Sequence, residues 1–234
     1  PGPGPSRLAH DDDWRRWRRC RHRAWQRFDR VQVFSDRDRG AATALAPALA
    51  DRFDVNPFGI TLPTVCDPAK EQDGEILYIA DFSQPTNVDA AQWLAREILP
   101  VVVQHRPSAH LTLIGANAPH DVRRLAGERV TFLGRVDDPR RWFEQAAVVA
   151  APVRVGGGRK MKVLESLALG KAVVTTSFGV EGLTGAPLVY GDDLATSVRK
   201  ITELLADDDR RRDLGRRARR HVEQHFSPQA HVLR

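Results

Sequence analysis

The chain from Glu75 to about Phe226 alternates between short apolar runs and longer amphipathic segments. The apolar runs have the length of β-strands and are nearly continuous in hydrophobic residues, which is typical of strands that are buried on both faces. In order, they are EILYIA from Glu75, HLTLIG from His110, RVTFLG from Arg129, AVVAAPV from Ala147, AVVTT from Ala172 and a short run near Leu188. Helices between such strands predict an α/β fold, a Rossmann-like parallel sheet with helices on both faces.

The chain before residue 61 has a shorter pattern of the same kind. A helix is expected from Asp11 to Phe28, followed by the strand RVQVFS, the helix DRDRGAATALAPAL and the strand-like RFDVNPFGI. These elements predict a partial β-α-β segment. We therefore expect a flexible leader at 1–10, the end of a first Rossmann-like domain at 11–60, a linker at 61–74, the second domain at 75–227 and the start of a tail at 228–234.

Composition narrows the class of protein. The hydrophobic fraction of 41% and the charged fraction of 28% are those of an ordinary globular protein. Neither of the two cysteines lies in a CxxC motif and the eight histidines have no ligand spacing, so we expect no disulfide framework, no metal site and a cytoplasmic protein. No apolar run reaches the roughly 20 residues of a membrane span, so any membrane contact would be peripheral, at the inner face.

The net charge of +6 is concentrated in one segment, RRWRRCRHRAWQRFDR, between Arg15 and Arg30. In this predicted helix Trp14, Trp17 and Trp25 share an apolar stripe with Phe28, which favours the core of an incomplete domain. The alternative is a basic module that contacts RNA or an anionic membrane surface. The stripe favours the core, and no nucleic acid is expected as a partner.

A glycine-rich turn stands out among the strand-to-helix loops, where ligands bind in open α/β sheets. It lies in APVRVGGGRKMKVLESLALG, from Ala151 to Gly170. Gly156, Gly157 and Gly158 have no Cβ atoms, so their backbone N–H groups can approach a ligand closely. The turn is neither a P-loop nor a GxGxxG motif.

The helix that is expected to begin at Arg159 carries cations at its positive end. Arg159, Lys160 and Lys162 crowd its first turn, which costs roughly 0.3–1 kcal/mol per charge at an exposed site. A bound diphosphate would relieve this repulsion, and Glu165 on the same polar face as Ser166 could accept hydrogen bonds from sugar or ribose hydroxyls. The alternative is a surface turn before a solvated face on which Lys162 and Glu165 form a weak pair.

Resemblance to a family agrees with the ligand hypothesis. PVRVGGGRKMKVLESLALGKAVVTTSFGVEGL, from Pro152 to Leu183, resembles the donor-site signature of GT-B glycosyltransferases, specifically family 4 (group 1). QPTNVDAAQWLAREILPVV, FLGRVDDPRRWFEQAAVVAAPVR and LLADDDRRRDLGRRARRHVEQHFS also resemble this group. The resemblance implies the C-terminal, nucleotide-sugar-binding half of a GT-B fold, preceded by only the tail of the N-terminal domain.

The resemblance also implies roles for residues. Glu165 matches the ribose-binding second glutamate of the family's paired-glutamate motif, and Gly157 stands where the first glutamate is usual. The cations that many members carry after the first strand are absent from ADFSQPTN. The implied diphosphate ligands are therefore Arg159 and Lys162 with the turn Gly156, Gly157 and Gly158, and Lys160 and Arg154 are weaker candidates.

Further candidates for the donor cleft come from the same resemblance: Asn87, Arg135, Val136, Val163, Leu164, Glu181 and Gly182. Other interpretations remain for some of them. Asn87 could help to cap a helix that begins near Thr86. Asp137, Asp138 and Pro139, after Arg135 and Val136, also read as a helix start, and Glu181 and Gly182 could form a tight turn.

The activity implied by the resemblance is transfer of a sugar from a nucleotide-diphosphate sugar to an acceptor hydroxyl, with retention of anomeric configuration and without a metal or other cofactor. The acceptor would be a glycan or a lipid-linked sugar, in polysaccharide or glycolipid biosynthesis. Catalytic residues are expected mostly on the N-terminal domain, so this chain alone is expected to transfer little or no sugar. A sugar-nucleotide epimerase of the same fold is a further alternative.

Overall fold

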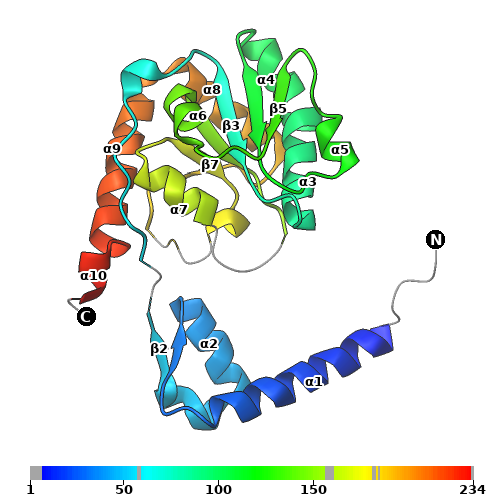
Figure 1. Ribbon diagram of the computed structural model, residues 1–234, viewed down its shortest axis with the longest axis vertical. Helices are drawn as coiled ribbons and strands as arrows, with labels where there is room; N and C mark the ends of the chain where they lie inside the picture. The colour runs from blue at the N-terminus through cyan, green and yellow to red at the C-terminus, as the bar shows by residue number, and fades with distance from the viewer. Residues whose placement is uncertain (1–6, 57–58, 156–160, 181–182, 184, 233–234) are drawn as a thin grey trace. The chain divides into compact units, whose positions relative to one another are not determined.

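The computed structural model describes residues 7–56, 59–155, 161–180, 183 and 185–232, and side chains between residues 16 and 230 (Figure 1). The chain divides into two compact units, Pro1–Phe58 (unit 1) and Gly59–Arg234 (unit 2). The assignment of these units to the two domains expected from the sequence stays a prediction.

Unit 1 is a helix followed by a β-α-β segment. It contains α1 (Arg7–Trp25), β1 (Val31–Val33), α2 (Asp36–Leu45), the 3₁₀ helix η1 (Pro47–Arg52) and β2 (Phe53–Val55), with β1 and β2 parallel. The helix α1 begins within the stretch 1–10 that was expected to be a leader. The second helix ends earlier than predicted because Pro47 cannot continue it. The small core contains Phe53, against which Trp25 packs edge-on with ring centroids 5.1 Å apart.

Unit 2 is built on a six-stranded parallel sheet in the order β5-β4-β3-β6-β7-β8. The strands are β3 (Glu75–Ile79), β4 (His110–Ile114), β5 (Val130–Gly134), β6 (Val148–Ala151), β7 (Val173–Thr175) and β8 (Val189–Tyr190). All six lie within one or two residues of the predicted positions. This is the strand order of a doubly wound nucleotide-binding fold, so the predicted fold class is confirmed.

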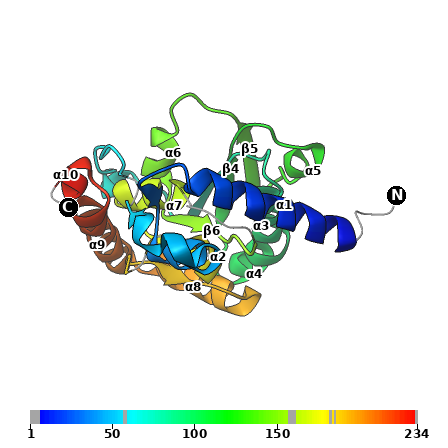
Figure 2. The same cartoon turned by 90° about the horizontal axis from the view of Figure 1, so that it is seen from below.

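Helices cover both faces of this sheet, as Figure 2 shows. One face carries α3 (Pro85–Trp93), a π-helical segment η3 (Leu94–Ile98), α4 (Leu99–His105), α5 (His120–Arg123) and α8 (Leu194–Ala206). The other carries α6 (Arg140–Gln145), α7 (Met161–Ala168) and α9 (Asp208–His225). The short elements η2 (Pro68–Lys70), η4 (Ser177–Val180) and α10 (Pro228–Val232) complete the described secondary structure.

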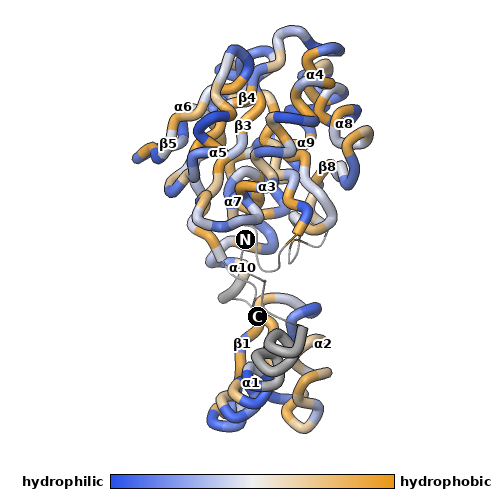
Figure 3. Tube along the Cα trace, turned by 90° about the vertical axis from the view of Figure 1, so that its right-hand side faces the viewer, coloured by the Kyte–Doolittle hydropathy of each residue, from blue (hydrophilic) through white to orange (hydrophobic). Residues whose placement is uncertain are grey.

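Alternation along the strands divides the core into two layers. In β3, Ile76 and Tyr78 face the layer under α3 and α8, whereas Leu77 and Ile79 face α7. Figure 3 shows the hydrophobic residues gathered inside unit 2. Since both faces of the central strands β3, β4, β6 and β7 are buried, their sequences are almost uninterrupted in apolar residues, whereas the edge strands expose Leu133 and Tyr190.

The segment 61–74, which was expected to be a linker, packs on unit 2. Glu71 accepts a hydrogen bond from the Nζ of Lys171 at 2.6 Å and pairs with the Nε of Arg211 at 3.2 Å. Arg140 donates to the carbonyls of Thr64 and Val65 at 2.8 and 3.1 Å. The contacts of Glu71 and Arg140 thus fasten this segment to the rest of unit 2.

Candidate functional site

The strand order reverses between β3 and β6, which are neighbours in the sheet but not in the chain. In parallel α/β sheets the crevice beyond the carboxyl ends of such a pair is where ligands bind. The segments that leave these ends are 80–84, which leads into α3, and 152–160, which leads into α7. The predicted donor-site residues belong largely to these two connections and their helices.

The helix α7 is amphipathic as predicted. Val163, Leu164 and Leu167 are fully buried against the sheet, and Lys162 and Glu165 lie on the outer side. Ser166 was expected on that polar face, and this prediction is wrong. Its side chain is completely buried, and its hydroxyl donates to the carbonyl of Lys162 at 2.6 Å, one turn back. A serine hydroxyl satisfied inside its own helix can be buried at little cost.

The side chain of Lys162 reaches from α7 to β3 and α3. Its Nζ donates to the Oδ1 of Asn87 at 2.5 Å and to the hydroxyl of Tyr78 at 3.2 Å, and it lies 4.9 Å from the centre of the Tyr78 ring. Tyr78 belongs to β3, Asn87 to α3 and Lys162 to α7. The three segments therefore meet at the ammonium of a residue predicted to bind the donor diphosphate.

The described partners of this ammonium are neutral. Burial, and to a smaller extent the charge of Asp89, raises the pKa of Tyr78 well above its ordinary value, so the phenol keeps its proton. Its hydroxyl donates in turn to the backbone carbonyl of Asn87 at 3.2 Å. Tyr78 and Asn87 thus fix the position of the Lys162 ammonium where β3, α3 and α7 meet.

Asn87 does not cap the helix. The N-cap of α3 is Gln84, Pro85 is the first helical residue, and no side chain caps this end. The Nδ2 of Asn87 instead donates to the backbone carbonyl of Asp81 at 2.7 Å, while its Oδ1 accepts from Lys162. The alternative of a capping role is therefore wrong, and the residue lies at the crevice.

Glu165 lies one turn beyond Lys162. Its side chain is exposed, yet the surrounding protein partly desolvates the carboxylate and raises its pKa above the ordinary value. Among the described residues it forms no hydrogen bond or ion pair, and the weak Lys162–Glu165 pair of the alternative interpretation is not present. A desolvated carboxylate without a cation at a crevice is a candidate ligand group.

The exit of β6 is held by residues at the end of β7. The hydroxyls of Thr175 and Thr176 donate to the carbonyls of Ala151, at 2.9 Å, and of Val153. Gly179 makes this possible, because a Cβ there would lie 1.9 Å from the Thr175 hydroxyl oxygen. The segment that precedes the predicted diphosphate turn is therefore anchored to β7.

The remaining predicted residues lie farther from the switch between β3 and β6, have buried side chains, or fall outside the residues that the structure describes. Arg135 is exposed and Val136 half-buried beyond β5, the outermost strand. The side chains of Val163 and Leu164 lie in the core, which leaves only their backbone groups for a ligand. Pro139 is the N-cap of α6 rather than its first residue, and Asp138 accepts from the N–H of Arg140 at 2.9 Å. Outside the described residues are Gly156, Gly157, Gly158, Arg159, Lys160, Glu181 and Gly182.

The residue that sequence reasoning missed is Tyr78. Its signal was a single polar hydroxyl near the carboxyl end of the otherwise aliphatic run EILYIA. A buried tyrosine normally needs a partner for that hydroxyl, but the sequence does not show where the partner lies.

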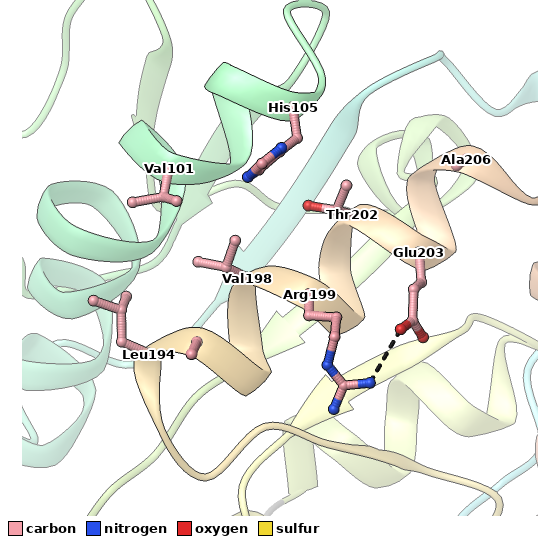
Figure 4. Close-up of a pocket in the computed structure, with 9 residues that line it drawn as sticks. Val101, His105, Leu194, Val198, Arg199, Thr202, Glu203 and Ala206 are labelled. Carbon is pink, nitrogen blue, oxygen red and sulfur yellow. Dashed lines mark hydrogen bonds and ion pairs between the residues drawn. The ribbon is translucent and has the colours of Figure 1, made fainter.

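An apolar groove of about 700 Å³ lies elsewhere in unit 2, between α4 and α8 (Figure 4). Val101 and His105 face Leu194, Val198 and Thr202 across it, and none of the predicted donor-site residues lines it. It is separate from the site at the switch between β3 and β6.

The described residues contain no group of three or more histidine, cysteine, aspartate or glutamate side chains that could hold a metal ion. None of their helices combines the length and the apolar character that are needed to cross a bilayer.

Among sequence relatives, the chain is 32% identical over 145 residues to the GDP-mannose-dependent monoacylated alpha-(1-6)-phosphatidylinositol monomannoside mannosyltransferase of Corynebacterium glutamicum. It is 24% identical over 164 residues to an uncharacterised 44.6 kDa protein from the cps region of Klebsiella pneumoniae. The matches cover 55% and 61% of this chain but only 38% and 42% of those proteins.

Solved structures share the fold. TarM of S. aureus, solved with fondaparinux, alpha-GlcNAc-glycerol and UDP, matches 89% of this chain with a TM-score of 0.75 at 14% identity, over 43% of its own length. HepE of Anabaena, solved with UDP-glucose, matches 90% with a TM-score of 0.69 at 17% identity, over 63% of its length. At these identities the likeness shows the fold, half of a GT-B architecture.

A match to a family model shows the family of this chain. The model described as glycosyl transferases group 1 matches residues 73–207, more than half of the chain and nearly all of the sheet of unit 2. This match favours a transferase over the epimerase alternative. The chain belongs to the glycosyl transferases group 1 family.

Proposed function

We propose that unit 2 binds the nucleotide-diphosphate sugar from which a glycosyltransferase takes the sugar. The observation that carries this proposal is the position of Lys162, whose ammonium is held by Tyr78 and Asn87 at the switch between β3 and β6. Glu165, an exposed but partly desolvated carboxylate, lies one turn away on the same helix. A cation and a carboxylate at this spacing suit a diphosphate and the hydroxyls of its ribose.

In this mechanism the chain stabilises the leaving group. Negative charge develops on the diphosphate as the sugar leaves, and a positioned ammonium at a helix N-terminus stabilises it. The proposed ligands are Lys162, with Arg159 and the turn Gly156, Gly157 and Gly158. The proposed transfer retains anomeric configuration, needs no metal and uses an acceptor hydroxyl on a glycan or a lipid-linked sugar, in polysaccharide or glycolipid biosynthesis.

The relatives support a nucleotide sugar but leave the base open. The Corynebacterium relative is named as GDP-mannose-dependent, whereas TarM and HepE were solved with UDP and UDP-glucose. Since the chain spans about two fifths of its sequence relatives, we propose that groups outside it bind the acceptor and orient the reacting hydroxyl.

Isothermal titration calorimetry tests donor binding. UDP- and GDP-sugars are titrated into the 234-residue chain, with the free sugars as controls and with EDTA in a parallel set. We expect one base to bind, free sugar not to bind, and EDTA to leave the affinity unchanged. No heat with either nucleotide sugar would refute the proposal, and loss of binding in EDTA would refute the metal-free mechanism.

Unit 1 supports a second, peripheral interaction. Trp17 is 60% exposed with Arg21 stacked on its ring at 5.0 Å, and Arg16, Arg18 and Arg19 are exposed. A basic helix with an exposed indole fits an anionic membrane surface, at the cytoplasmic face. Sedimentation with phosphatidylglycerol vesicles should be lost in a variant with these three arginines changed to Gln. Binding that is equal with neutral vesicles, or seen only with RNA, would contradict it.

A further inference from the structure

Arg154 lies on the exit of β6, directly before the predicted diphosphate turn. Its guanidinium forms a two-point ion pair with Asp89 of α3, with Nη2–Oδ1 at 2.6 Å and Nε–Oδ2 at 3.1 Å. Its Cζ lies 4.7 Å from the centre of the Trp93 ring. An arginine at this position of the sequence looks like a further ligand of the donor diphosphate.

The geometry argues against that role. Side-on pairing occupies the Nε and one Nη of the guanidinium, and stacking on Trp93 fixes the plane of the group. To reach a diphosphate the side chain would have to leave both partners. Doing so would also leave the carboxylate of Asp89 without a counter-charge.

Asp89 is the residue for which this pairing matters most. It lies in α3 two residues after Asn87, which holds the ammonium of Lys162. The negative charge of Asp89 contributes to the raised pKa of the Tyr78 phenol, which also contacts that ammonium. An uncompensated carboxylate here would oppose a diphosphate and compete with it for Lys162.

We infer that Arg154 is a positioning residue, which cancels the charge of Asp89 and anchors the exit of β6 to α3 so that the donor diphosphate meets a net positive site. The inference rests on the proposed function. It assigns the clamp Asp89–Arg154–Trp93 to the donor site although none of the three side chains contacts the donor. Together with the hydroxyls of Thr175 and Thr176, which bind the carbonyls of Ala151 and Val153, the clamp holds the exit of β6 on both sides.

A double-mutant cycle tests the inference by calorimetry with the nucleotide sugar that binds the unaltered chain. Arg154→Gln should weaken binding by about tenfold, because one unscreened negative charge near a diphosphate costs roughly that much. Asp89→Asn alone should strengthen binding by up to about tenfold, because it leaves the positive charge of Arg154 uncompensated. The double variant Arg154→Gln with Asp89→Asn should recover to within about threefold of the unaltered chain, since neither charge remains.

The recovery separates the inference from its rivals. If the double variant binds as weakly as Arg154→Gln, Arg154 contacts the donor or acts only by holding the fold, and the inference is wrong. If Arg154→Gln binds normally, it is wrong as well, while the proposed function stands. If the unaltered chain binds neither UDP- nor GDP-sugars, the proposed function fails and the inference with it.

A matched control comes from the ion pair of Arg106 with Asp73, at 2.7 Å. This pair joins the end of α4 to the turn before β3, at the amino edge of the sheet. Arg106→Gln should leave donor affinity unchanged. The defect of Arg154→Gln should also shrink as salt is raised, because exposed charges are screened, and a defect that does not respond to salt would contradict a charge effect.

Discussion

Two lysines of unit 2 lie in contrasting surroundings. Lys171 is 2% exposed and its ammonium pairs with the carboxylate of Glu71 at 2.6 Å. Lys162 is half-buried, and its described partners are a neutral amide and a neutral phenol. The ion pair of Lys171 fastens the segment before β3 to the domain, whereas the contacts of Lys162 place its ammonium where β3, α3 and α7 meet. In our proposal the first lysine is structural and the second binds the donor.

The largest expected effect comes from breaking the structural pair. Glu71→Ala leaves Lys171 and Arg211 buried without a shared counter-charge, and we expect the free energy of unfolding to fall by about 3–5 kcal/mol. Urea denaturation, followed by hydrogen exchange of the sheet amides of unit 2, measures the change.

The neighbouring Lys70→Ala is a matched control, because it removes an exposed pair with Glu144 and should cost less than about 1 kcal/mol. Equal losses in the two variants would show that the buried pair has no special structural role.

Lys162 should give the reverse result, a loss of donor affinity without a loss of stability. Lys162→Ala should weaken donor binding by about 10- to 100-fold, the range for a hydrogen bond to a charged group, with little change in unfolding free energy. Calorimetry and urea denaturation on the same samples test both halves. A large loss of stability with unchanged affinity would make Lys162 a second structural cation.

The role of Glu165 can be tested through the pH dependence of stability and of donor affinity. Its folded-state pKa is raised above the ordinary 4.5 by desolvation, so the ionised carboxylate costs stability above that pH, and the cost disappears as the group is protonated. Donor affinity should follow the opposite course and fall as pH decreases through the raised pKa. Glu165→Gln should lower affinity at pH 7 by about fivefold, stabilise the chain slightly and abolish this pH dependence. A pH profile that is identical in the variant would contradict the role of the carboxylate.

The smallest effect is expected from the phenol that holds Lys162. Tyr78→Phe keeps the ring beside the ammonium and removes one hydroxyl, so donor affinity should fall by about two- to threefold. Asn87→Ala removes the shorter hydrogen bond and should have the larger effect of the two. If Tyr78→Phe weakens binding more than Lys162→Ala does, the phenol contacts the donor itself.

The sequence predicted the sheet well because the central strands β3, β4, β6 and β7 are buried on both faces. A strand that is buried on both faces has a continuous apolar sequence such as EILYIA, and helices between such runs imply parallel strands. Among the described residues of α7, the predicted polar face failed at Ser166, whose hydroxyl finds a partner within its own helix. A helical wheel cannot distinguish such a serine from an exposed one.

The candidate site was predictable in its location but not in its connections. The turn and the cations before α7 marked the carboxyl end of β6, and the parallel order placed β3 beside it. The connections are the contacts of Lys162 with Tyr78 and Asn87 and the ion pair of Arg154 with Asp89. They depend on side-chain directions at residues far apart in the chain. Spacing along one segment carries no information about them.

The most direct measurement is the affinity of the 234-residue chain for UDP- and GDP-sugars before and after the paired change Lys162→Ala with Glu165→Ala. If the switch between β3 and β6 is the donor site, the unaltered chain binds one of the two nucleotide sugars and the double variant loses at least about 100-fold in affinity. An affinity that is unchanged in a correctly folded double variant would contradict the donor site at α7 and, with it, the proposed function.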